Sequence, residues 1–155
     1  RCLLSFDTKY DTIKAKTCQA VSLWNAKLRA KDLGGRKMLA MKMDLACYHG
    51  LEDLLAEAKY MASFPDADEL FTEDVKNLSI ALEIMRHEIN PDLPAPKVSA
   101  EELKEVVSRL SDLWEYSADQ VQKDPTERIW QRDLASIDYF QEVAKNLRKE
   151  TAAHG

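Results

Sequence analysis

The residues of this chain that are best suited to chemistry lie together in residues 34–43, which read Gly-Gly-Arg-Lys-Met-Leu-Ala-Met-Lys-Met. Gly34 and Gly35 interrupt a helical pattern, and Arg36 and Lys37 place two cations directly after them. The first N–H groups of a helix have no acceptor within the helix, and they carry partial positive charge. Together with the two cations, they could bind a small anion. The alternative is that both cations are solvated residues near a helix end.

Outside this stretch, the sequence contains no complete set of catalytic or metal-ligating residues. His49 and His87 do not follow a glutamate at the Glu-x-x-His spacing that di-iron bundles use, and His154 lies in the tail. There is no Gly-x-Ser-x-Gly motif for a nucleophile, and no strand precedes Gly34 as a phosphate-binding loop would require. We therefore predict that the chain is not an enzyme and that it carries no metal or other cofactor.

The cysteines give no sign of a metal site or of a closed set of disulfides. The chain has three cysteines, Cys2, Cys18 and Cys47, so they cannot all pair with one another. None of them belongs to a Cys-x-x-Cys pair. We predict that Cys18 and Cys47 face a core, where a free thiol behaves as a small hydrophobic group. Their redox state, and with it the cellular compartment, stays open.

Length, charge and composition predict a single all-α domain. The 155 residues match the size of one domain, residues 1–155. A formal net charge of -5, from 22 basic and 27 acidic residues, argues against a nucleic-acid partner, which would need a surplus of lysine and arginine. Only four glycines and five prolines, with 32% charged residues, are typical of a helical protein.

The ends of the sequence suggest a piece of a longer protein. The first residue is Arg1 rather than Met, and residues 1–6 are too short for a signal peptide. No apolar run reaches the length of about 18 residues that a membrane-spanning helix needs. We therefore expect that any attachment to a membrane runs through flanking segments that this chain does not contain.

Apolar residues recur at helical spacings of three, four and seven in four long segments. These segments are residues 10–61, 72–89, 99–121 and 125–147. The glycine pair falls inside the first, and a break or kink is expected there because a glycine within a helix costs about 1 kcal/mol relative to alanine. Proline-containing stretches separate the segments.

Two helix starts can be assigned from side chains. Ser99 and Glu102 have the spacing of a capping box, in which each side chain accepts a hydrogen bond from the other residue's backbone N–H. Asp124 followed by Pro125 predicts a second start, with the aspartate as N-cap and the proline at the first helical position. Together with the periodicity, these starts predict an antiparallel four-helix bundle.

The segment 33–43 resembles the signature helix of the PilJ-type sensor domain, which is related to the input domain of nitrate-sensing histidine kinases. That signature reads approximately Ala-Gly-Arg-Gln-Arg-Met-Leu-Ser-Gln-Arg-Met. Alignment on the Met38-Leu39 pair places Gly34 on the glycine of the signature and Met43 on its final methionine. Lys37 and Lys42 fall on its second and its last arginine. Residues 81–86 and 106–115 resemble the second and third helices of that family, the latter around its Leu-Trp pair.

The resemblance implies an extracytoplasmic sensor domain of a transmembrane chemoreceptor or histidine kinase, periplasmic or extracellular and attached to the inner membrane. Such domains are normally homodimers, bind a small ligand such as nitrate at the subunit interface, and signal by helix displacements of about 1 to 2 Å. The implied ligand-binding residues are Gly34, Gly35, Arg36, Lys37 and Met41. Lysine lacks the planar fork that arginine offers to an oxyanion, so the identity of the ligand stays open.

Two other functions fit a helical bundle. The first is a protein–protein interaction module without a small ligand, which would expose an apolar groove to a partner. Burial of Trp24, Trp114 and Trp130 would favour a self-sufficient bundle, whereas their exposure would favour partner docking. The second is a cofactor-binding bundle, for which the five methionines are candidate ligands but are better interpreted as core residues.

Overall fold

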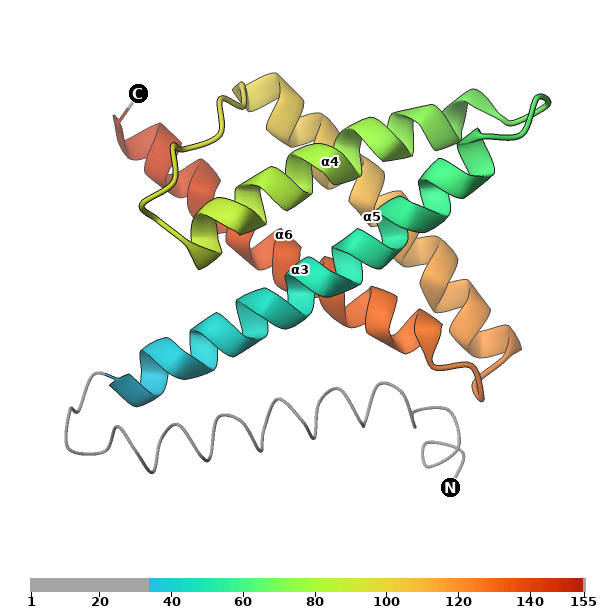
Figure 1. Ribbon diagram of the computed structural model, residues 1–155, viewed down its shortest axis with the longest axis horizontal. Coiled ribbons are helices and arrows are strands. Elements are labelled where there is room, and N and C mark those ends of the chain that lie inside the picture. The colour runs from blue at the N-terminus through green and yellow to red at the C-terminus, as the bar shows by residue number, and fades with distance from the viewer. Residues whose placement is uncertain (1–33, 155) are drawn as a thin grey trace.

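The computed structural model describes residues 34–154, which form four helices joined by short connections (Figure 1). They are α3 (Gly34–Ala62), α4 (Glu69–Ile89), α5 (Ala100–Lys123) and α6 (Ile129–His154). Within this range there is no strand. The prediction of an all-α four-helix bundle is confirmed, and the part of the first predicted segment that precedes Gly34 lies outside the described residues.

The four helices form two antiparallel hairpins that cross each other (Figure 1). Helices α3 and α4 make the first hairpin, and α5 and α6 make the second. Helix α3 packs against α6, and α4 packs against α5, which closes the bundle. The turns of the two hairpins lie on the same side of the molecule, at the right in Figure 1, but well apart from each other.

The core lies where the two hairpins cross. Its largest fully buried apolar side chains are Leu51, Leu78, Met85, Val106, Leu110, Ile137 and Phe140. Cys47 is buried among them, as predicted, while Cys2 and Cys18 lie outside the described residues. The prediction that the methionines fill the core holds for Met85, but Met41 and Met43 are 40% and 43% exposed. They lie on the first turns of α3, which project beyond the other described helices (Figure 1).

Local capping fixes the starts of α4 and α5. The capping box is present, because Ser99 Oγ accepts from Glu102 N at 3.1 Å and Glu102 Oε1 accepts from Ser99 N at 3.2 Å. Helix α4 begins three residues before the predicted start at Thr72, because the Asp68 carboxylate caps it by accepting from Leu70 N at 3.0 Å.

The predicted start of α6 at Asp124 is wrong. Asp124 is instead the C-cap of α5, where its N–H donates to the Gln120 carbonyl at 2.8 Å. Its carboxylate accepts from the Thr126 hydroxyl at 2.6 Å and is therefore engaged in the turn. Helix α6 begins at Ile129, whose N–H donates to the Glu127 carboxylate at 3.3 Å.

Helices α3 and α6 come into close contact at Gly50. A Cβ atom added at Gly50 would lie 1.9 Å from Ser136 Oγ and 2.8 Å from Ser136 Cβ, and because rotation of the hydroxyl would not relieve the second contact, a larger residue requires movement of one helix. One turn earlier on α3, the Cys47 thiol donates to the Ser136 carbonyl at 3.3 Å. This contact holds the two hairpins together beside the core.

Candidate functional site

The structure places the predicted anion-binding residues at the start of α3. Gly34 and Gly35 begin the helix, so Arg36 and Lys37 fall within its first turn. The side chains of these four residues lie outside what the structure describes. Met41 is 40% exposed on the same helix. The described part of the chain therefore gives the backbone of this candidate site, and its ligand contacts stay a prediction.

A second candidate site, which sequence reasoning did not find, is a cavity of about 380 Å³ near the turns of the two hairpins. All four described helices contribute to its wall, from the last turns of α3, the middle turns of α5 and the first turns of α4 and α6. The volume falls within the range of roughly 300–1,000 Å³ that is usual for small-molecule sites. We call it the hairpin cavity.

Aromatic side chains form part of the wall of the hairpin cavity. They are Phe71 on α4, Tyr116 on α5 and Trp130 on α6. The rings of Tyr116 and Trp130 lie edge to face, with centroids 5.8 Å apart and planes at 78°. Tyr116 is exposed and Trp130 is half-buried, so both residues of this pair are in part accessible to solvent.

The charged side chains of the hairpin cavity are predominantly acidic. Five carry carboxylates and one carries a guanidinium: Glu57, Asp68, Asp74, Asp112, Asp133 and Arg109. Arg109 is already paired, because its Nε donates to Asp74 Oδ1 at 2.5 Å and its Nη1 donates to Asp112 Oδ2 at 3.2 Å. The remaining three carboxylates have no cation of their own within the wall.

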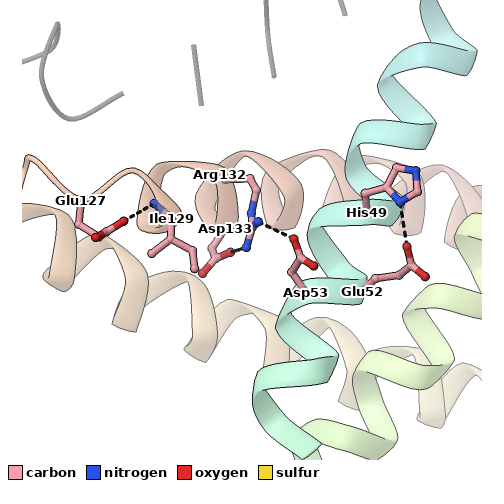
Figure 2. Close-up of polar contacts among 7 residues, drawn as sticks. All are labelled: His49, Glu52, Asp53, Glu127, Ile129, Arg132 and Asp133. Atoms are coloured by element: carbon pink, nitrogen blue, oxygen red, sulfur yellow. Dashed lines mark hydrogen bonds and ion pairs between the residues drawn. The ribbon is translucent and has the colours of Figure 1, made fainter. Parts of the chain in front are cut away.

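Asp133 is the most deeply buried of these carboxylates, with a side chain only 1% exposed. Its Oδ1 accepts from Arg132 Nη2 at 3.3 Å, while Arg132 Nη1 reaches Asp53 Oδ2 on α3 at 2.5 Å. Figure 2 shows the Arg132 guanidinium between these two carboxylates. Asp133 Oδ2 has no hydrogen-bond partner among the described residues.

Burial raises the pKa of Asp133 to about 7. The nearby negative charges of Glu57 and Asp53 also raise this pKa, whereas the positive charge of Arg132 lowers it. A buried carboxylate favours its neutral form because the charged form loses its hydration. Asp133 therefore changes charge near neutral pH. A strongly shifted pKa in a cavity is a common property of functional residues.

The other polar groups that could do chemistry have structural roles. Burial raises the pKa of the Cys47 thiol to about 12, so Cys47 is not a nucleophile near neutral pH. The Tyr139 hydroxyl donates to Asp44 at 2.5 Å, which ties α6 to α3. His49 pairs with Glu52 at 2.8 Å on the exposed face of α3 (Figure 2), and a His87 ring nitrogen donates to the Leu93 carbonyl at 3.0 Å.

Across the described residues, no three His, Cys, Asp or Glu side chains are grouped as a metal site would require. In the same range, no helix has both the length and the apolar character needed to cross a membrane. Trp114 and Trp130 are half-buried, and Trp24 lies outside the described residues, so the tryptophans do not separate a self-sufficient bundle from a docking module.

Comparison with known proteins gives no relative: no family model, no curated protein and no solved structure matches this chain. The resemblance to the PilJ-type sensor domain therefore depends on the motif residues alone.

The sequence does carry one signal for the hairpin cavity. Asp133 interrupts the apolar stripe formed by Trp130, Ile137 and Phe140, which share its face of α6 at spacings of three, four and seven. A carboxylate at a core position needs a partner or a function, because an unpaired buried charge is strongly unfavourable.

Proposed function

We propose that this chain is the small-molecule-binding sensor domain of a transmembrane chemoreceptor or histidine kinase, and that its ligand occupies the hairpin cavity. The observation that carries this proposal is Asp133, a buried residue of the wall of a ligand-sized cavity, whose carboxylate has one oxygen without a hydrogen-bond partner among the described residues. A mainly apolar cavity with a few convergent polar groups is the usual form of a small-molecule site.

The position of the cavity suggests how binding would produce a signal. Its wall is divided between the α3–α4 hairpin and the α5–α6 hairpin, so a ligand there contacts both. A ligand that binds one relative position of the hairpins better than another shifts the population toward it. Displacements of about 1 to 2 Å between packed helices are typical of such transitions.

The start of α3 supports a second candidate, the anion site that the resemblance implies. Arg36 and Lys37 lie in the first turn of a helix that has no acidic residue there. Cations at a helix N-terminus are unfavourable by roughly 0.3–1 kcal/mol each, and a bound anion such as nitrate would offset this. Leu39 and Met43, which are exposed on the next turns and four residues apart, share one face of α3 and give an apolar surface suited to an interface between two copies.

The extracytoplasmic location, the homodimer and the membrane anchors in flanking segments belong to this proposal through the family resemblance. The rival function, a helical protein–protein interaction module, needs none of these and binds no small ligand. The two therefore differ in a measurable property, the response of the purified chain to small molecules.

An amide NMR titration tests the proposal and locates the site. Nitrate and a set of small organic molecules of mixed charge would be added to the ¹⁵N-labelled chain at constant ionic strength. We expect one class of molecules to shift saturably the amides that surround the cavity, around Glu57, Asp74 and Asp133. Shifts confined to residues 34–37 on adding nitrate would favour the second candidate. A spectrum that no compound changes would favour the interaction module.

A further inference from the structure

The charge of the hairpin cavity selects among small-molecule ligands. Its wall carries five carboxylates and one guanidinium, and that guanidinium is paired with Asp74 and Asp112. An anion placed among these groups would meet Glu57, Asp68 and Asp133 without a free cation of the wall to bind it. Like charges brought together in a partly desolvated site repel strongly, so the wall rejects anionic ligands.

Asp133 lines the cavity, and a small movement of the wall would make its buried, unpaired Oδ2 an acceptor for a positively charged group. Its only described hydrogen bond comes from Arg132, which also pairs with Asp53 and holds Oδ1 rather than Oδ2. A buried acceptor without a hydrogen bond is unfavourable, and a ligand that supplies the missing donor removes this penalty. Charge-assisted bonds to a carboxylate are roughly twice as strong as neutral ones.

The aromatic side chains of the wall suit the uncharged part of such a ligand. The edge-to-face pair of Tyr116 and Trp130, with Phe71 on α4, offers an apolar surface for a hydrocarbon or aromatic body. The faces of tryptophan and tyrosine also attract cations, more strongly where the pair is removed from water. Carboxylate and aromatic rings are thus present in one cavity.

We infer that the ligand of the hairpin cavity is a small organic cation, an ammonium group carried on an apolar or aromatic body, with Asp133 as its counter-ion. This inference rests on the proposed function and names the chemical class of its ligand. It differs from the anion that the family resemblance implies at residues 34–37.

Binding of such a cation requires ionised Asp133 and therefore depends on pH. The charged groups that act on this carboxylate are Arg132 on its own helix and Asp53 and Glu57 on α3. Those that share the cavity wall with it from the other helices are Asp68 at the N-cap of α4, Asp74 on α4, and Arg109 and Asp112 on α5. Because the pKa of Asp133 is about 7, its ionised fraction falls as pH is lowered from 8 to 6. The affinity for a permanently charged ligand should fall about tenfold over that interval.

A set of matched probes tests the charge preference directly. 2-Phenylethylamine, 2-phenylethanol and 3-phenylpropanoate have similar bodies and carry positive, zero and negative charge. We expect the amine to bind at least tenfold more tightly than the other two in NMR titrations at pH 7.5. Asp133→Asn should weaken the amine at least tenfold and leave the alcohol unchanged. Asp138→Asn is the matched control, since Asp138 is an exposed aspartate on the same helix outside the cavity wall.

A second measurement needs no variant and so does not depend on the folding of Asp133→Asn. Benzyltrimethylammonium, which does not titrate, should bind the unmodified chain about tenfold more weakly at pH 6 than at pH 8. Equal affinities for the amine, the alcohol and the carboxylate would overturn the cation assignment and leave the cavity as a binding site. Absence of binding by every probe, at the solubility limit of each, would overturn both the assignment and the cavity as the sensor site.

Discussion

Replacing Asp133 with asparagine should stabilise the protein, and more so at high pH than at low pH. Asparagine has nearly the same shape, and its amide oxygen can still accept the hydrogen bond from Arg132. What it removes is the ionisable group in the wall of the hairpin cavity. The expected gain follows from the unfavourable burial of the charge, and a gain of this kind is common where a binding residue is retained at the expense of stability.

The magnitude follows from the pKa of Asp133, which burial raises from 3.8 to about 7. The folded protein therefore holds this proton more tightly than the unfolded chain does. As pH rises from about 4 to 7, the unfolded chain releases the proton first, and the free energy of unfolding falls. At 1.36 kcal/mol per pKa unit, the loss is roughly 1.5 kcal/mol at pH 5 and roughly 4 kcal/mol at pH 8.

Urea unfolding of the original chain and of Asp133→Asn at pH 5 and pH 8 measures this difference. The stability gain of the variant should be larger at pH 8 by about 2.5 kcal/mol, or roughly 5–10 °C in Tm for a protein of this size. At each pH, the free energy of unfolding of the original chain must be subtracted from that of the variant. Burial also raises the pKa values of Asp44 and Glu88, and the subtraction removes their contribution to the pH dependence, which both proteins share. Asp138→Asn, which removes an exposed aspartate from the same helix, should show no such difference.

One result would refute this reasoning. If the stability difference between Asp133→Asn and the original chain were the same at both pH values, Asp133 would not titrate in this window. Its carboxylate would then have the same ionisation in the folded and unfolded chain, and its burial would carry no unfavourable charge.

Three further predictions concern packing, capping and reactivity. Gly50→Ala should destabilise the protein by more than about 2 kcal/mol through its clash with Ser136, and Ser136→Gly in the same chain should recover much of this loss in a double-mutant cycle. Ser99→Ala should lower the free energy of unfolding by about 1 kcal/mol, whereas Asp124→Ala should leave the start of α6 unchanged in NMR chemical shifts. With the other two cysteines changed to serine, Cys47 should react with a disulfide reagent only under unfolding conditions, and fast labelling of the native protein would contradict its burial.

The helices could be predicted from the sequence because their apolar stripes and the Ser99 capping box are local patterns. The start of α6 could not, since an aspartate followed by proline suits both the end of one helix and the start of the next. The choice depends on the Gln120 carbonyl, which accepts from Asp124 N and makes it the C-cap of α5. The start of α4 was missed because the periodicity begins later than the Asp68 cap.

The hairpin cavity could not be predicted because its wall comes from four helices that are distant in sequence. Periodicity assigns residues to a buried face but gives neither the crossing of the hairpins nor the space between them. Asp133 was nevertheless visible as a carboxylate within an apolar stripe. The residues that the sequence did favour, Gly34 to Lys37, form the first turn of α3, and their role as an anion site stays a prediction.

The ¹³Cγ chemical shift of Asp133, followed through a pH titration with and without benzyltrimethylammonium, reports the protonation of this carboxylate directly. If the cavity binds an organic cation opposite Asp133, the apparent pKa should lie near 7 in the free protein and fall by one unit or more when the probe saturates the site. An Asp133 pKa that is unchanged at saturating probe would contradict the assignment of this carboxylate as the counter-ion of the ligand.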